Sequence, residues 1–174
     1  MQLRTCLLSA FTLSTVLSFG IAAIAGDLPK EGALKGTYFS FGTAKAVPIG
    51  KEKLLIAWEE NGLQLTDGFL DHVTWHCWGT GDYVNGMGQD RGNCVGTDPS
   101  GDQEVFSTDD EKHSPDQKVV SGTFTYTAGT GKYAGISGGG KWTGHAGEFR
   151  PAAEGTYFQY VTFQGSYKLQ PLTQ

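Results

Sequence analysis

The chain has 174 residues, with 18 acidic side chains against 13 basic ones and a formal net charge of −5. This length suits one ordinary domain with a real core. The acidic balance disfavours nucleic acids and anionic membrane surfaces as partners.

Residues 1–25 have the pattern of an export signal. Arg4 precedes an apolar stretch interrupted by small hydroxyl residues, and Ala23-Ile24-Ala25 provides a small-x-small cleavage pattern. A retained membrane anchor is the alternative, but the stretch is short and rich in serine and threonine. We therefore predict a signal peptide over 1–25, a single domain over 26–174, no membrane span after cleavage, and a secreted or periplasmic location.

Glycines divide the remaining chain into short runs rich in threonine, valine and aromatic residues, and no stretch keeps a helical period over three turns. This combination is typical of an all-β protein. We expect eight strands, at 36–42, 53–60, 71–79, 91–97, 102–108, 118–127, 139–146 and 155–168.

The connections have distinct compositions. The glycine-rich segment 79–92 lacks the lysine of a phosphate loop and is expected to be a long, mobile loop at a barrel rim. Residues 98–102 indicate a tight hairpin, whereas 109–118 are polar enough to form a solvated loop. Residues 26–34 and 170–174 are expected to be loose ends.

Cysteine usage points to one disulfide. Cys6 is lost with the signal, which leaves Cys77 and Cys94 in an exported chain. A reactive thiol or a metal-binding pair is the alternative, but no C-x-x-C motif is present. Closing this loop contributes ~3 kcal/mol on a chain-entropy estimate, and the bridge is expected to tether both ends of the 79–92 loop.

A short sequence motif that occurs twice suggests how the sheet closes. Gly36-Thr37-Tyr38-Phe39 near the start recurs as Gly155-Thr156-Tyr157-Phe158 near the end. Sequential antiparallel strands of this number usually close, because closure removes exposed edges. We therefore predict that the first and last strands pair in an eight-stranded antiparallel barrel, whose interior is filled or holds one small ligand.

The segment Ala128-Gly129-Thr130-Gly131-Lys132-Tyr133-Ala134-Gly135-Ile136-Ser137-Gly138 resembles a turn of the allene oxide cyclase barrel and dirigent-like superfamily, and residues 94–102 resemble its uncharacterised bacterial exported members. The resemblance implies a calycin-like barrel, often dimeric or trimeric, with a short helical turn here. Relatives include cyclases of reactive intermediates and dirigent proteins that guide radical coupling. None of their catalytic residues maps onto this chain, so the activity does not transfer.

Histidines provide the first candidates for chemistry. His72 and His76 are expected on one strand, four residues and ~13 Å apart, which is too far for a shared zinc ion. With Glu59 they are candidate acid–base groups if they line a cavity. We favour the alternative, a solvent-facing stripe with Trp75 and Cys77 pointing inward.

Carboxylates and aromatic side chains provide two further groups. We interpret the acidic residues near the hairpin as turn formers rather than calcium ligands, and we expect no metal and no cofactor; they are Asp98, Asp102, Glu104, Asp109 and Asp110. Aromatic residues of such a barrel form a packed core or line an apolar pocket. The four nominated as ligand-binding are Trp75, Tyr126, Trp142 and Tyr157.

Three functions remain open. The leading hypothesis is a binding module that holds a small apolar or aromatic molecule. The second is a cyclase or isomerase that acts on a reactive hydrophobic intermediate through His72, His76 or Glu59. The third is a non-catalytic interaction barrel, and a homo-oligomer is compatible with each.

Overall fold

The computed structural model describes residues 29–146 and 153–170. The signal peptide expected over 1–25 lies outside these residues and stays a prediction, as does the loose end expected over 170–174, of which only Gln170 is described. Within the described residues, no helix is long and apolar enough to cross a membrane.

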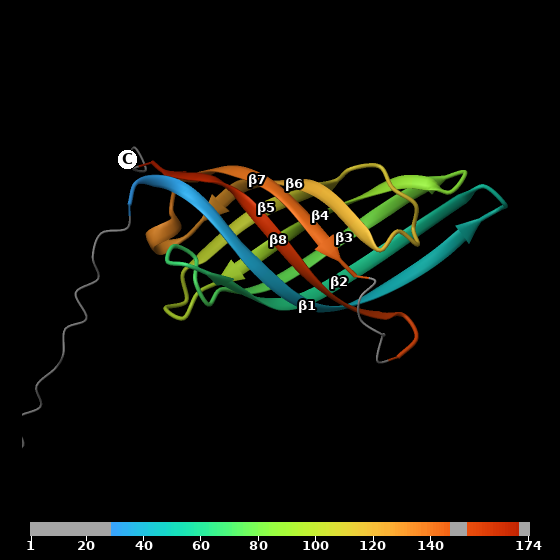
Figure 1. The fold of residues 1–174 in the computed structure, drawn as a ribbon, viewed down its shortest axis with the longest axis horizontal. Coiled ribbons are helices and arrows are strands. Elements are labelled where there is room, and N and C mark those ends of the chain that lie inside the picture. The colour runs from blue at the N-terminus through green and yellow to red at the C-terminus, as the bar shows by residue number, and fades with distance from the viewer. Residues whose placement is uncertain (1–28, 147–152, 171–174) are drawn as a thin grey trace, which may run out of the picture.

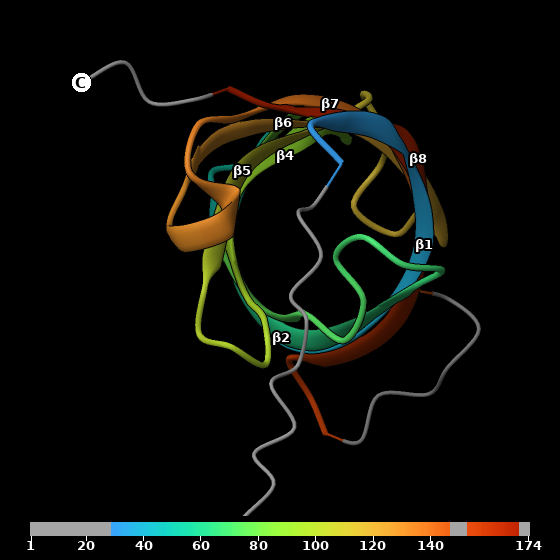
Figure 2. The ribbon, with the colours of Figure 1, turned by 90° about the vertical axis from the view of Figure 1, so that its left-hand side faces the viewer.

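The described residues form an antiparallel barrel that closes in simple sequence order, so the predicted fold class is confirmed (Figures 1 and 2). A short 3-10 helix, η1 (Gly131–Tyr133), joins β6 (Val119–Gly129) and β7 (Ile136–His145), where the family resemblance implied a helical turn. The eight strands are β1 (Glu31–Ile49), β2 (Lys53–Thr66), β3 (Thr74–Val84), β4 (Met87–Thr97), β5 (Gln103–Asp110), β6 (Val119–Gly129), β7 (Ile136–His145) and β8 (Thr156–Leu169).

The first and last strands close the barrel, as the repeated Gly-Thr-Tyr-Phe motif predicted. Tyr38 of β1 lies opposite Val161 of β8, and Phe41 lies opposite Phe158. This pairing leaves neither strand with a free edge.

Alternation along each strand decides which side chains enter the barrel. In β3, Cys77 and Tyr83 are buried, whereas His76 and Trp78, on either side of Cys77, face outward. Cys77 lies directly opposite Cys94 of β4, and the predicted disulfide joins these two residues.

The loop expected over 79–92 is instead a regular hairpin. β3 and β4 pair continuously from Thr74 to Val84, and only Asn85 and Gly86 form the turn, at φ values of 52° and 76°. Positive φ at both positions is what the favoured two-residue hairpin turn needs, and Asn-Gly provides it. The disulfide therefore cross-links adjacent strands and does not tether a mobile loop.

Several other strand boundaries differ from the predictions. β1 begins at Glu31, inside the expected loose end, and continues to Ile49 although the prediction ended it at 42; β2 continues to Thr66 although the prediction ended it at 60. β5 extends to Asp110, so the expected solvated loop over 109–118 begins within a strand. Its residue His113 is buried, because its backbone pairs with Gly88 of β4.

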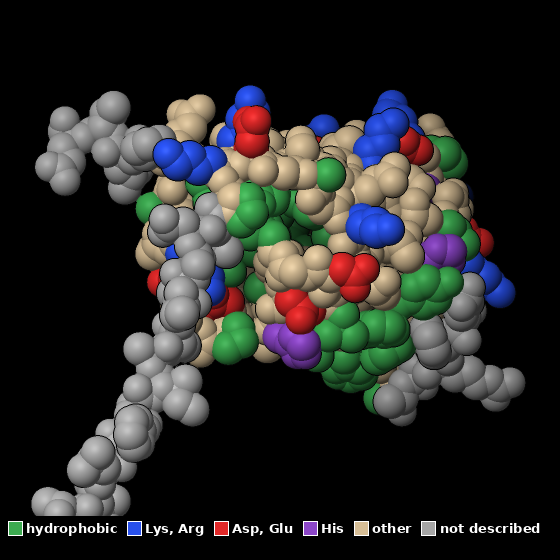
Figure 3. Space-filling model, turned by 60° about the vertical axis from the view of Figure 1, so that its left-hand side comes forward, with side chains coloured by type: hydrophobic (Ala, Val, Ile, Leu, Met, Phe, Trp, Pro, Cys, Tyr) green, Lys and Arg blue, Asp and Glu red, His purple; other side chains and the backbone are tan. Residues whose placement is uncertain are grey.

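One end of the barrel is filled by apolar side chains. The segment 67–73 folds over this opening (Figure 2). Its Leu70 and Val73 side chains are buried. The Phe69 ring stacks on Tyr167, with centroids 3.7 Å apart, and meets Tyr133 edge to face. Figure 3, in which this end comes forward, shows hydrophobic side chains in a hollow and on the outer wall.

The outer face of β1 and β2 also carries apolar side chains. Phe39, Phe41, Leu63 and Leu65 are each between 38% and 48% exposed. Phe39 and Leu63 lie opposite each other in the pairing of the two strands, so these side chains share one region of the wall. The expected homo-oligomer stays a prediction.

Candidate functional site

The other half of the barrel is hollow. A cavity of about 410 Å³ opens at the end where the odd-numbered strands finish and the even-numbered ones begin, and it extends inward to Trp75 near the start of β3 and Tyr126 near the end of β6. This volume is within the range of small-molecule sites. Its aromatic lining includes all four nominated residues, Trp75, Tyr126, Trp142 and Tyr157, together with Tyr38, Trp58, Tyr83, Phe106, Phe124 and Phe163.

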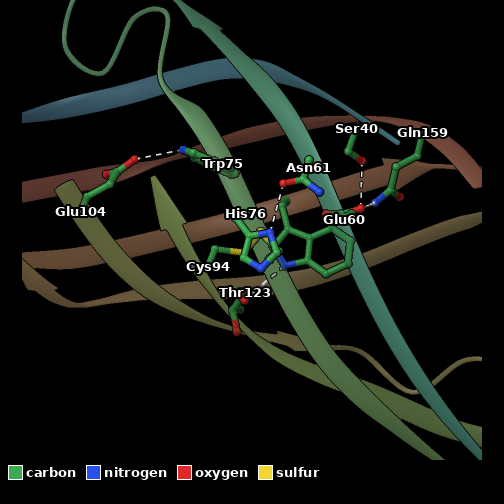
Figure 4. Close-up of a disulfide and its surroundings, with 11 residues drawn as sticks. Ser40, Glu60, Asn61, Trp75, His76, Cys94, Glu104, Thr123 and Gln159 are labelled. Carbon is green, nitrogen blue, oxygen red and sulfur yellow. Dashed lines mark hydrogen bonds between the residues drawn. A yellow bond between two sulfur atoms is a disulfide. The ribbon is translucent and has the colours of Figure 1, made fainter. Parts of the chain in front are cut away.

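Glu60 places a carboxyl group in the cavity wall. It lies on β2, is 7% exposed, and its Oε2 accepts hydrogen bonds from Ser40 Oγ and Gln159 Nε2, both at 2.8 Å (Figure 4). Burial raises the pKa of this carboxyl above its ordinary value, against the lowering effect of these hydrogen bonds. The site therefore favours the protonated acid more than solvent does.

Two tyrosine hydroxyls lie near this carboxyl. Burial raises the pKa of Tyr38 and of Tyr157 far above the usual range, and the negative charge of Glu60 adds to the effect. Both phenols are therefore neutral hydrogen-bond donors. Among the described residues, the buried Tyr38 hydroxyl makes no hydrogen bond of good geometry, although Ser40 and Glu60 lie close enough to affect its pKa.

Trp58 enters the cavity because two facing residues have no side chain. A Cβ atom at Gly79 or Gly92 would lie 2.3 Å or 2.5 Å from the indole ring. The buried indole Nε1 has no partner in the part of the chain that the structure describes. The ring thus brings a second unused donor into the cavity.

A second buried carboxyl group lies near the start of β5, on the side of the packed end. Glu104 on β5 accepts a hydrogen bond from the Trp75 indole at 3.2 Å (Figure 4). Burial raises the pKa of Glu104 to about 8, although the Trp75 bond opposes the shift. This pair orients Trp75, whose ring packs against Tyr38 and Phe106.

A third polar group lines the open half, and we call it the mouth cluster: Tyr83, Asp90, Asp110 and His113. His113 Nε2 lies 3.2 Å from Asp110 Oδ2 and 3.5 Å from Asp90 Oδ2. Burial, and next the charge of Asp90, raise the pKa of Asp110 to about 7. Three strands and one loop therefore supply ionisable groups to one small volume.

The predicted acid–base residues lie elsewhere. His72 belongs to the turn before β3 and not to a strand; it has a φ of 56° and pairs with Asp71 at 2.6 Å. His76 and Glu59 face outward from β3 and β2, 3.5 Å apart and about half exposed. None of the three lines the cavity, which agrees with the solvent-facing interpretation of this stripe.

The acidic residues near the hairpin do not form one group. Asp98 caps the 98–102 turn, where its Oδ1 accepts hydrogen bonds from the Ser100 and Asp102 backbone amides. Burial alone would raise the Asp98 pKa, but hydrogen bonds from Lys132, Ser100 and Tyr133 hold it far below its usual range. Asp109 faces outward to Arg91, whereas Glu104 and Asp110 point inward.

The sequence reasoning did not nominate Glu60, Asp90 or His113 and wrongly interpreted Asp110 as a turn former, although strand alternation contains a signal for some of these residues. Glu60 lies two residues after the inward Trp58, and Asp90 lies four residues before the inward Cys94. Asp110 lies four residues after the inward Phe106. An even spacing from an apolar inward residue indicates the same face of a strand.

Comparison with known proteins adds one finding. No protein-family model matches the sequence, and no curated protein matches it. Among solved structures, a pterocarpan synthase dirigent protein superposes with a TM-score of 0.52 at 10% sequence identity, over 84% of this chain and 91% of that chain. This chain therefore has the barrel fold of a dirigent protein, as the resemblance of the 128–138 turn implied.

Proposed function

We propose that this chain is an exported barrel that binds one small aromatic molecule carrying hydroxyl or carbonyl groups in its hollow half. The observation that carries the proposal is a ligand-sized cavity with an aromatic lining and unused polar atoms. The Tyr38 hydroxyl and Trp58 Nε1 are both buried, belong to cavity-lining residues, and have no hydrogen-bond partner among the described residues.

Unpaired buried donors in an aromatic cavity favour a ligand that has both aromatic rings and hydrogen-bonding oxygens. A buried polar atom without a partner costs about 1–3 kcal/mol, and a ligand oxygen that accepts from it recovers part of that cost. The aromatic rings offer stacking and edge-to-face contacts to a planar molecule. The dirigent fold of a pterocarpan synthase supports an aromatic ligand by analogy.

Two neighbouring glutamates provide a matched test of whether the Glu60 carboxyl group contributes to ligand binding. Glu60→Gln changes the inward carboxyl, whereas Glu59→Gln changes the adjacent outward one. A panel of phenols and methoxybenzenes is titrated while tryptophan fluorescence is recorded. We expect saturable binding of phenols, at least tenfold weaker binding (about 1.4 kcal/mol) in Glu60→Gln, and no change in Glu59→Gln.

A second pair of variants tests the location of binding. Ala44 lines the cavity, so Ala44→Phe fills part of it, whereas Ala57→Phe adds the same ring to the exposed face of β2. Binding is expected to fall in the first variant only. No saturable binding of any aromatic probe to the unchanged protein, or equal losses in both variants, would refute the proposal.

A second candidate function is an isomerisation or cyclisation of the bound molecule, with Glu60 as proton donor. The raised pKa of this buried carboxyl and the two neighbouring tyrosines favour it. Atoms are conserved in such a step, because Glu60 donates a proton to one atom of the substrate and recovers one from another. His72, His76 and Glu59 have no role in this scheme.

Turnover distinguishes this candidate from simple binding. Compounds that bind are incubated with the protein in D₂O and analysed by mass spectrometry for isomers and incorporated deuterium. Catalysis predicts product in the unchanged protein and in Glu59→Gln, and none in Glu60→Gln at saturating ligand. If the ligands are recovered unchanged from all three proteins, catalysis is refuted and binding is the only function supported.

A further inference from the structure

The mouth cluster contains a set of donor atoms typical of a metal site. Asp90 comes from β4, Asp110 from the end of β5 and His113 from the following loop. The side chains of His113, Asp110 and Asp90 are 7%, 10% and 15% exposed, so bulk solvent screens their charges little. Three potential ligands from different segments thus converge in a buried place.

The proton on His113 can be located from its neighbours. His113 Nδ1 lies 2.8 Å from the backbone oxygen of Ser114, which can only accept a hydrogen bond. Nδ1 therefore carries a hydrogen, and a neutral imidazole has its lone pair on Nε2. That lone pair faces the Asp110 and Asp90 carboxyl oxygens, and the Tyr83 hydroxyl, 3.2 Å from Nε2, is a donor beside it.

A second observation concerns oxygens without donors. Asp90 Oδ2 accepts from the Tyr83 hydroxyl, but Asp90 Oδ1 is buried without a partner among the residues described. No lysine or arginine forms an ion pair with Asp90 or Asp110 in that same set. The two carboxyl groups therefore have no lysine or arginine beside them within the described residues.

The distances fit a metal ion. His113 Nε2 lies 3.2 Å and 3.5 Å from the two carboxylate oxygens, and all three ligand atoms lie within 4.8 Å of one another. Nitrogen and oxygen ligands at 2.0–2.2 Å from a tetrahedral zinc ion are about 3.3–3.6 Å apart. The separations of 3.2 Å and 3.5 Å are close to the edges of such a tetrahedron, and the two carboxyl oxygens lie within 4.8 Å of each other.

The surroundings hold these ligands in place. The backbones of His113 and Gly88 exchange two hydrogen bonds, at 2.8 Å and 3.0 Å, which attach the loop to β4. The Nδ1–H bond to Ser114 orients the imidazole ring, the usual arrangement for a metal-binding histidine. The site is therefore organised before any ion arrives.

From this geometry we propose that Asp90, Asp110 and His113 bind one divalent transition-metal ion, zinc in the first instance, at the cavity mouth. Three protein ligands leave a fourth position, and the cluster lines the cavity. An oxygen of a bound molecule can occupy that position, as can the Tyr83 hydroxyl. The proposal is independent of Glu60, which belongs to a different part of the wall.

The test compares Asp110→Asn with Asp109→Asn. Asp110 points into the cluster, whereas its neighbour Asp109 faces outward to Arg91. Each full-length protein is freed of metal with a chelator and titrated with Zn²⁺ by calorimetry. We expect one ion per unchanged chain, at least tenfold weaker binding in Asp110→Asn, and unchanged binding in Asp109→Asn.

Two further measurements keep the proposal falsifiable if Asp110→Asn folds poorly, as judged by circular dichroism. Asp90→Asn is expected to lose the same affinity, and Co²⁺ added to the unchanged protein is expected to produce the intense visible absorption of a tetrahedral site. A protein that binds no zinc, or that binds it equally in all variants, would refute the site. In that case His113, Asp90 and Asp110 form a hydrogen-bonded group that holds no ion.

Discussion

The two halves of this barrel are built from the same strands, but one half is packed with apolar side chains and the other contains a cavity. At the end covered by 67–73, aromatic and aliphatic side chains fill the interior, and Phe69 stacks on Tyr167. At the other end, Glu60 and the mouth cluster surround a cavity of about 410 Å³. Apolar packing at one end supports the buried ionisable groups at the other, whose desolvation opposes folding.

The largest expected effect concerns the packed end. Tyr167→Ala removes a ring that is 3% exposed and stacked on Phe69, and should lower the free energy of unfolding by about 3–5 kcal/mol. Urea denaturation measures the loss. Tyr157→Phe, which keeps its ring in the hollow half, should cost about 1 kcal/mol or less. Equal losses would mean that the halves do not differ as described.

The disulfide should have the next largest effect. The double substitution Cys77→Ser with Cys94→Ser opens a loop with a sequence separation of 17 and should cost about 3 kcal/mol. A reductant should destabilise the unchanged protein to a similar extent and leave the variant unaffected. A reductant-insensitive unchanged protein would contradict the inferred role of the bridge.

The pH dependence of stability should expose the buried Glu104. Its pKa is raised from 4.5 to about 8, so the folded state binds more protons than the unfolded state over this interval. Its contribution to stability is therefore fully present below pH 4.5 and is lost as pH rises towards 8, with a slope of at most about 1.4 kcal/mol per pH unit.

The matching variant is Glu104→Gln, because an amide keeps the acceptor for Trp75 but does not ionise. Urea denaturation at several pH values should show stability falling less steeply with pH in this variant than in the unchanged protein. Glu60 and Asp110 also have raised pKa values, so the difference between the two proteins is the relevant quantity. If the free energy of unfolding falls with pH equally steeply in both proteins, the raised pKa of Glu104 is contradicted.

The smallest effect is expected on the outer wall. His76→Ala removes a ring that faces solvent and contacts Asn61 and Glu59, so stability should change by less than about 0.5 kcal/mol. Aromatic ligand binding in the cavity should not change either, as measured by fluorescence titration. A large loss of ligand binding in His76→Ala would contradict the outward placement of this histidine and support a role in the binding site.

Much of the architecture could be predicted from local patterns. The repeated Gly-Thr-Tyr-Phe motif indicated that β1 and β8 pair, and Cys77 and Cys94 indicated the bridge. The 79–92 hairpin was missed although Asn85-Gly86 is a strong turn signal, because the surrounding glycines suggested a loop. The four nominated aromatic residues do line the cavity, while their role in binding stays a prediction.

The chemistry of the site depended on longer-range information. His113 lies in a segment polar enough to indicate a solvated loop, and only its pairing with Gly88 carries it into the barrel. His72 and His76 were attractive because two histidines four residues apart are visible in any sequence. Polar residues far apart along the chain can share one volume without leaving a local pattern.

The sequence by itself determined the all-β class, the eight-stranded closure and the disulfide, because periodicity, turn residues and cysteine number are local properties. Only the tertiary structure decided that one half of the barrel is hollow and that Glu60, Asp90, Asp110 and His113 face into it. The reason is physical: a closed barrel converts strand alternation and register into a common interior, and that register is set by contacts between distant segments.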